Sequence, residues 1–79
     1  MLRIDTEAIR REIDKSGLKM QAIAERMFIS RATLYSGLSG KRDFSIEELN
    51  ALCRILAPDD PGSLMQIFLT EKLAESQLY

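Results

Sequence analysis

The segment SRATLYSGLSGKRD, at residues 30–43, holds the side chains best suited to recognition chemistry. Its second residue, Arg31, carries a planar guanidinium that donates paired hydrogen bonds to acceptors such as a guanine edge or a phosphate. Ser30 has the character of a helix cap, which puts Arg31 in the first turn of a helix. A cation is electrostatically unfavourable there. We therefore expect Arg31 to serve binding rather than folding.

The helix that follows Ser30 is one of a closely spaced pair. An apolar stripe predicts a helix over residues 20–27, and only residues 28–30 separate the two. A turn of this length between short helices is typical of a helix-turn-helix, whose second helix lies in the major groove of DNA. The first turn of that second helix faces base edges and phosphates, which accounts for Arg31. Without this spacing, a solvated surface charge would be the simpler interpretation.

Helix start and stop signals predict five short helices and leave no room for strands. Ser45 and Glu48 form an S-x-x-E capping box, the strongest of the start signals. The expected caps are Thr6, Ser30, Ser45 and Asp60, and the expected stops are Gly17, Gly40 and Pro58. The expected inward residues are Ile9, Ile13, Ile23, Ala24, Met27, Leu34, Leu38, Ile46, Leu49, Leu52, Cys53, Leu56, Leu64, Ile67 and Phe68. The sequence thus predicts an all-α fold of four to five helices.

Length and composition exclude several classes of protein. Seventy-nine residues form one small domain, a size at which a core alone gives marginal stability. Cys53 is the only cysteine and there is no histidine, so we expect neither a disulfide nor a metal or other cofactor, and a second copy of the chain could add stability instead. No nucleophile pattern or Gly-rich phosphate loop predicts an enzyme. We recognise no signal peptide or membrane span, which predicts a cytoplasmic protein.

The distribution of charge favours a nucleic-acid partner more than its total does. Eleven basic residues stand against twelve acidic ones, for a net charge of −1. Residues 18–42, however, contain five basic residues against Glu25 alone, whereas the rest of the chain has six basic residues against eleven acidic ones. The positive charge is therefore concentrated around the predicted helix-turn-helix, as expected for an electrostatic footprint on DNA.

The segment MQAIAERMFISRATLYSGLSGKRDFSIEELNALCRIL, at residues 20–56, resembles the XRE-type helix-turn-helix domain of Cro and phage repressor proteins. The resemblance covers residues 6 to about 57, and similarity to small Cro-like prophage regulators extends it to about 69. It implies a lambda-repressor-like domain that binds double-stranded operator DNA as a homodimer and represses transcription. On this basis residues 1–57 form the DNA-binding domain, and residues 58–79 form a C-terminal helix and tail that serve dimerisation.

The resemblance also assigns contacts residue by residue. The positions that match base contacts in the family are Arg31, Ala32 and Ser36. The positions that match contacts with phosphate or the groove wall are Lys19, Gln21, Ser30, Thr33, Tyr35, Lys41 and Arg42. Base contacts specify sequence, whereas phosphate contacts position the protein. For Tyr35, covering the edge of the core is an alternative role.

Three residues depart from the family pattern. Met20 replaces the glutamine that often begins the first helix of the pair. Phe28 occupies the turn position usually held by glycine, where a positive φ would strain a bulky residue. Either the turn has another geometry or packing holds Phe28 in place. Gly37 lies mid-helix, where alanine would be about 1 kcal/mol better, so we expect it to allow close approach to a neighbouring surface.

The C-terminal segment SLMQIFLTEKLAESQLY, at residues 63–79, has more apolar residues than one short helix can bury against the rest. A surplus of this kind usually marks an interface. The expected dimer contacts are Ile67, Phe68, Leu69 and Leu73. In the alternative, residues 70–79 are a frayed tail and only the helix docks internally. A second functional class also stays open, a protein-interaction module on the same fold that acts as an antirepressor or repressor modulator.

Overall fold

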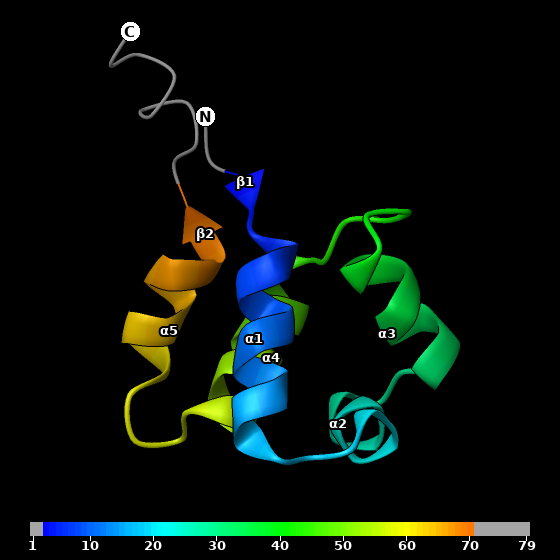
Figure 1. Ribbon diagram of the computed structural model, residues 1–79, viewed down its shortest axis with the longest axis horizontal. Helices are drawn as coiled ribbons and strands as arrows, with labels where there is room; N and C mark the ends of the chain where they lie inside the picture. The colour runs from blue at the N-terminus through cyan, green and yellow to red at the C-terminus, as the bar shows by residue number, and fades with distance from the viewer. Residues whose placement is uncertain (1–2, 71–79) are drawn as a thin grey trace, which may run out of the picture.

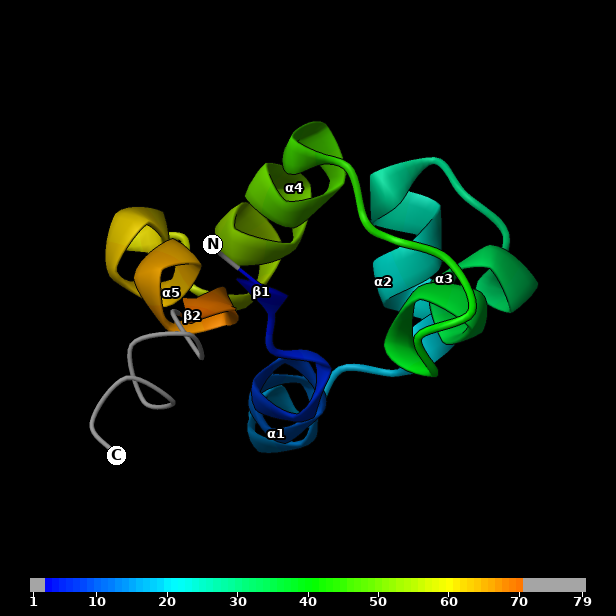
Figure 2. The same cartoon turned by 90° about the horizontal axis from the view of Figure 1, so that it is seen from above.

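The computed structural model of the protein describes residues 3–70, which form five short helices (Figure 1). The helices are α1 (Thr6–Ser16), α2 (Met20–Met27), α3 (Arg31–Leu38), α4 (Ile46–Leu56) and α5 (Pro61–Phe68). The prediction of an all-α fold is confirmed. Seen from above, α1 and α4 lie between the α2–α3 pair on one side and α5 on the other (Figure 2). None of the helices in the described part of the chain is both long and apolar enough to span a bilayer.

The structure adds a small antiparallel ribbon that the sequence did not predict. Strand β1 (Arg3–Ile4) pairs with β2 (Leu69–Thr70), with Ile4 opposite Leu69. A backbone hydrogen bond of 2.7 Å from Asp5 N to the Phe68 carbonyl oxygen extends this contact. Strands of two residues are too short to show an alternating pattern, so the sequence carried no signal for them. The ribbon fastens the segment before α1 to the end of α5 (Figure 1).

Most helix boundaries follow the predicted caps. Ser45 and Glu48 form the expected capping box at the start of α4, and the Asp60 side chain caps α5 with Pro61 at its first position. Thr6 is not the cap of α1, because the carboxylate of Asp5 accepts the Ala8 N–H at 3.0 Å. A carboxylate at this position also interacts favourably with the helix dipole, so it outcompetes the neighbouring hydroxyl.

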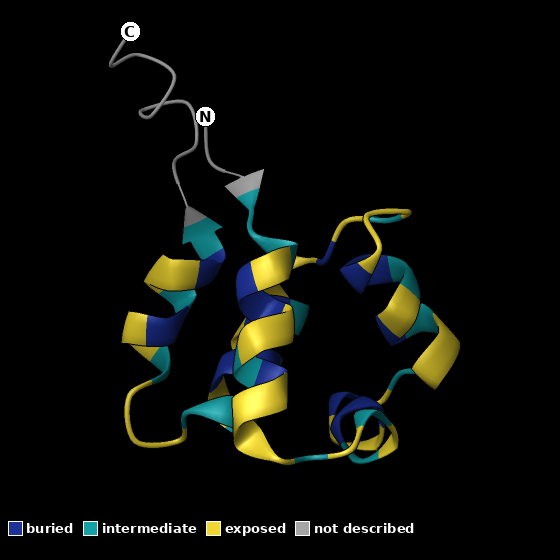
Figure 3. Ribbon diagram, in the orientation of Figure 1, coloured by how far each residue is buried: buried dark blue, intermediate teal, exposed yellow. Residues whose placement is uncertain are grey.

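The core lies where the helices face one another, while exposed residues cover the outward face of α1 (Figure 3). Its fully buried side chains include Phe68, Ile9, Ile23, Leu34, Leu49, Leu52 and Cys53. Two residues expected in the core are instead 57% and 49% exposed, namely Ile46 and Ile67. Ile46 is the first residue of α4 and is not among the residues that pack against the core. Ile67 lies beside Phe68 on α5, and Leu64 and Phe68 already supply the buried face of that short helix.

Candidate nucleic-acid interface

The turn between α2 and α3 has the geometry of a tight helix-turn-helix. The Phe28 N–H donates to the Glu25 carbonyl oxygen and the Ile29 N–H donates to the Ala24 carbonyl oxygen, each at 3.1 Å. This pair of bonds is the Schellman pattern, in which the residue after the helix adopts a left-handed conformation. Phe28 accordingly has φ 60° and ψ 38°. Ile29 then packs against the core, which fixes the direction in which α3 begins.

Phe28 contradicts both of the alternatives expected for it. The turn keeps the left-handed geometry, and the Phe28 side chain is 94% exposed instead of being held by packing. Its backbone conformation is therefore imposed by the hydrogen bonds of the turn and by the packing of the partly buried Ile29 against the core. A bulky residue in this conformation is strained, and within residues 3–70 the aromatic ring gains almost no burial in return.

The first turn of α3 exposes two of the three predicted base-contacting residues, Arg31 and Ala32. Ser30 Oγ accepts the Thr33 N–H at 3.0 Å and lies 2.8 Å from Thr33 Oγ1, so these two hydroxyl groups close the helix start together. Arg31 and Ala32 follow the cap and are exposed, and Ser36 is half-buried one turn further on. Ala32 and Ser36 are four residues apart and share one helix face. Arg31 lies in the same turn as Ala32 and is exposed like it.

A hydrogen bond from α1 holds the end of α3, and the sequence did not reveal this contact. Arg10 Nη2 donates to the Leu38 carbonyl oxygen at 3.2 Å, across 28 positions of the chain. A cation at the C-terminal end of a helix satisfies a carbonyl that has no partner in the helix and is favoured by the dipole. Only the three-dimensional arrangement of α1 and α3 brings these groups together, because no local pattern links residues so far apart.

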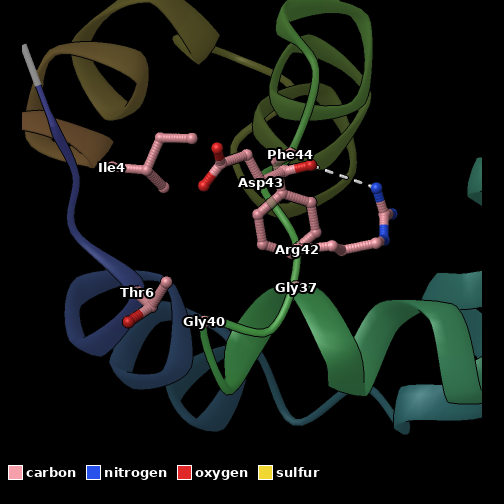
Figure 4. A pocket seen from close by; sticks show the side chains of 7 residues that line it. All are labelled: Ile4, Thr6, Gly37, Gly40, Arg42, Asp43 and Phe44. Carbon is pink, nitrogen blue, oxygen red and sulfur yellow. Dashed lines mark hydrogen bonds between the residues drawn. The ribbon is translucent and has the colours of Figure 1, made fainter.

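The two cations of the loop after α3 have different surroundings. Lys41 is exposed, as expected for a phosphate contact. Arg42 is half-buried, and its guanidinium donates to the Thr33 and Asp43 carbonyl oxygens and to both carboxylate oxygens of Glu48. Figure 4 shows the Arg42–Asp43 bond beside a cavity of about 540 Å³. The prediction that Arg42 contacts phosphate therefore conflicts with the internal use of its side chain.

Gly37 allows the close approach that was predicted for it. A Cβ built on Gly37 would come within 2.6 Å of Cε1 of Phe44, closer than two carbon atoms can pack. In Figure 4 the Phe44 ring lies directly beside the backbone of α3 at Gly37. Phe44 is only 5% exposed, so the absence of a side chain at Gly37 is what lets the loop close over α3.

The start of α2 supplies exposed polar groups beside α3. Lys19 and Gln21, two of the predicted phosphate contacts, are both exposed. Met20 between them turns inward and packs against the core. Together with Tyr35 it lines a cleft of about 280 Å³. Tyr35 is 49% exposed, so its side chain is open to solvent at the rim of this cleft.

The predicted dimer contacts separate into three groups. Ile67 is half-exposed and Leu69 is half-buried, so both present apolar surface. Phe68 is fully buried within the protomer and has no surface to offer a second copy, because it fills the space between α5 and the other helices. Leu73 lies outside the described residues.

An ion pair and its hydrogen bonds lie beside this surface. Across residues 3–70 there is no cluster of three or more side chains suited to hold a metal ion. The Arg42 guanidinium hydrogen-bonded to Glu48 lowers the pKa of that carboxyl, against the opposing effect of its partial burial. Glu48 is thus a carboxylate at neutral pH and holds Arg42 as an ion pair, with 3.0 Å between Arg42 Nη2 and Glu48 Oε2.

An exposed polar first turn on the second helix of a tight helix-turn-helix defines a class of DNA-binding regulators. Comparison with protein families gives the same result, with residues 8–67 matching the Cro/C1-type HTH DNA-binding domain. The match covers most of the chain, and the protein belongs to this family. The family resemblance stated from the sequence is therefore confirmed. Comparisons with curated proteins and with solved structures gave no match.

Proposed function

We propose that the protein is a cytoplasmic transcriptional repressor of the Cro type that binds a specific double-stranded operator with α3 in the major groove. The observation that carries this proposal is the exposed first turn of α3, where Arg31 and Ala32 follow the Ser30–Thr33 cap. Arg31 would read guanine O6 and N7 as a bidentate donor, and Ala32 could contact a thymine methyl group. Ser36, on the same face as Ala32, would donate to or accept from a base.

Backbone contacts would fix the register of α3 on the duplex without reading sequence. The residues proposed for this role are Lys19, Gln21, Ser30, Thr33, Tyr35 and Lys41. Lys19 and Lys41 are exposed and flank the α2–α3 pair in the sequence, and we assign both to phosphates of the duplex backbone. Arg42 is not part of this set, because its guanidinium is occupied within the protein.

The proposal is tested with duplexes selected from a random pool and with mixed-sequence duplex, both in gel-shift titrations. If Arg31 reads a guanine, Arg31→Ala should cost about 1–3 kcal/mol on the selected site and relax the choice of one base pair per half-site. Its thermal stability should be unchanged or higher, because a cation leaves the positive end of α3. A loss of stability with unchanged selectivity would make Arg31 a structural residue. Absence of binding to any duplex at low salt would refute the proposal as a whole.

We also propose that two copies bind together, because one helix-turn-helix reaches only a few base pairs. Family members of this kind place their recognition helices about 34 Å apart on a near-palindromic site. Among the described residues, we place Ile67 of α5 at the centre of the dimer interface, because its side chain is 49% exposed. Leu69 and Leu73, further along the chain, would extend the interface.

The dimer proposal is tested by analytical ultracentrifugation across micromolar concentrations. Ile67→Glu should shift the full-length chain toward the monomer, because it introduces a charge into the proposed apolar interface. Ile46→Glu is the matched control, since Ile46 is 57% exposed on α4 and should leave the mass unchanged. A wild-type chain that is monomeric throughout, or an equal effect of the two substitutions, would contradict the interface.

One observation favours the second candidate, a protein-interaction module on the same fold. Phe28 is a 94% exposed aromatic residue at the end of α2, and exposed aromatic side chains are typical anchors of protein interfaces. The gel shift separates the two candidates, since phosphate-dominated binding appears at low salt even without the right operator.

A further inference from the structure

We propose that Arg42 and Glu48 form a positioning pair that holds the first turn of the recognition helix α3, and so determines sequence discrimination without touching DNA. The inference rests on the proposed function. A guanidinium has five N–H groups, and four hydrogen bonds inside the protein use four of those of Arg42. Little donor capacity remains for a phosphate, although the residue carries a charge in the basic loop.

The pair joins the first turns of two helices. Arg42 Nε donates to the Thr33 carbonyl oxygen at 3.3 Å, and Thr33 belongs to the first turn of α3. Its two terminal nitrogens donate to Glu48 Oε1 and Oε2 at 3.2 and 3.0 Å, and Glu48 belongs to the first turn of α4. A bidentate guanidinium–carboxylate pair restricts orientation as well as distance. The start of α3 is thus tied to the start of α4.

The carboxylate end of the pair is itself fixed by the capping box. Glu48 Oε1 accepts the Ser45 N–H at 2.9 Å, and Ser45 Oγ accepts the Glu48 N–H at 3.1 Å. Glu48 therefore cannot follow Arg42 into another position without losing the cap of α4. The same residue that starts α4 serves as the anchor for the recognition helix.

Packing holds the guanidinium end of the pair. Arg42 Cζ lies 5.5 Å from the centroid of the Phe44 ring, within the range of a cation–π contact. The ring packs against α3 where Gly37 has no side chain. The Lys41 and Arg42 N–H groups both donate to the Ser36 carbonyl oxygen, at 3.0 and 3.3 Å. Arg42 is therefore fixed by its backbone N–H, by the contact of its guanidinium with the Phe44 ring and by the hydrogen bonds of its terminal nitrogens.

The location of Thr33 connects this arrangement with recognition. Arg31 and Ala32, the proposed base contacts, directly precede Thr33 in the same turn of α3. Base readout requires hydrogen-bond geometry at a fixed place in the groove, whereas charge neutralisation tolerates small displacements. Loosening the Thr33 contact should therefore reduce discrimination between sequences and leave non-specific affinity almost unchanged.

Three substitutions test the inference by gel shift, each on the selected site and on mixed-sequence duplex over a series of salt concentrations. Arg42→Lys keeps the charge but loses the two-pronged geometry. Glu48→Gln removes the carboxylate but can still accept from the Ser45 N–H in the cap. Lys41→Gln removes the neighbouring exposed cation and is the matched control for a phosphate contact.

The positioning role predicts that Arg42→Lys and Glu48→Gln each lower the ratio of specific to non-specific affinity by at least about tenfold. The upper limit is about 150-fold, which is the loss expected when one base contact is removed completely. Mixed-duplex affinity should stay within about twofold and the salt slope should not change. Lys41→Gln should instead weaken both duplexes alike and flatten the slope by about one. Amide hydrogen exchange at Leu34 without DNA should accelerate in the first two variants and not in the control, which shows that the change lies in α3.

The inference is overturned if Arg42→Lys keeps full discrimination, or if Glu48→Gln tightens binding to both duplexes by removing a repelling charge. Unchanged exchange at Leu34 in both variants overturns it as well. If the wild-type chain binds no duplex at low salt, the proposed function fails and the recognition role falls with it. If instead the wild-type chain discriminates between sequences and both variants discriminate equally well, the inference fails and the proposed function stands.

Discussion

Replacing Phe28 by glycine should stabilise the protein. A non-glycine residue in the left-handed conformation, as at φ 60° here, costs about 1–2 kcal/mol. Glycine avoids that cost but loses about 0.5–1 kcal/mol more conformational entropy on folding. The side chain is 94% exposed, so its removal sacrifices about 0.3 kcal/mol of apolar burial. The net gain is about 0.5 kcal/mol, which corresponds to about 2–4 °C in Tm for a domain of this size.

Two further variants separate backbone strain from the loss of the ring. Phe28→Ala removes the ring but keeps the strained conformation, so its Tm should stay near that of the wild type. Gly17→Ala is the reverse test, since Gly17 ends α1 at φ 72° with nothing within 4 Å of a built Cβ. Its Tm should fall by about 3–6 °C, the equivalent of about 0.75 kcal/mol, because the lower entropy cost of alanine offsets part of the strain.

Thermal and urea unfolding, each followed by circular dichroism at several protein concentrations, provide the measurement. A lower Tm for Phe28→Gly would refute the strain argument. A decrease that grows with protein concentration would show that a second copy covers the Phe28 ring, because stability then depends on association. An unchanged Tm in Gly17→Ala would show that a positive φ costs little free energy in this fold. The stabilisation expected for Phe28→Gly would then have no basis.

Two other predictions follow from the loop after α3. Gly37→Ala should lower the free energy of unfolding by about 1 kcal/mol, measured in urea. Overpacking against Phe44 costs about 1–3 kcal/mol and exceeds the gain in helix propensity of about 1 kcal/mol. A variant that is more stable than the wild type would contradict the close approach. The Arg42–Glu48 pair holds the pKa of Glu48 below its ordinary value near 4.5, so its stabilisation is present above that pH and is lost as the pH falls through the lower folded value. Acid titration of unfolding should therefore show a decline below about pH 4.5 that is smaller in Glu48→Gln, and equal declines would argue against the pair.

Local rules were enough to predict most of the fold. The caps at Ser30, Ser45 and Asp60 depend on neighbours within three residues, so the sequence shows them directly, and the structure places all three as predicted. The same holds for the left-handed end of α1 at Gly17. Ile46 and Ile67 were misjudged because helical periodicity marks an apolar stripe without showing how far the neighbouring helix extends over it.

The candidate site was predictable in its location but not in its internal contacts. The spacing of α2 and α3 and the cap at Ser30 fix where Arg31 lies, and both are local. By contrast, the Arg10–Leu38 and Arg42–Thr33 hydrogen bonds join different segments, at separations of 28 and 9 residues. A basic residue in a basic loop looks the same in sequence whether it faces phosphate or a carboxylate. Arg42 was assigned to phosphate because its position matches a phosphate contact in the family, and its partners in space show a use inside the protein.

The use of Arg42 inside the protein also changes the expected strength of DNA binding. In the part of the chain that the structure describes, Lys19, Arg31 and Lys41 take part in no ion pair, and they are the cations proposed to face DNA. Lys19 and Lys41 are the two assigned to phosphates, so two protomers would neutralise about four phosphates, which sets the magnitude of the slope of log K against log salt at about 3.6. Non-specific binding with so few contacts should be weak at physiological salt. Binding to a specific site would then depend on base contacts whose geometry is fixed before the protein meets DNA, and fixing that geometry is the role proposed for the pair of Arg42 and Glu48.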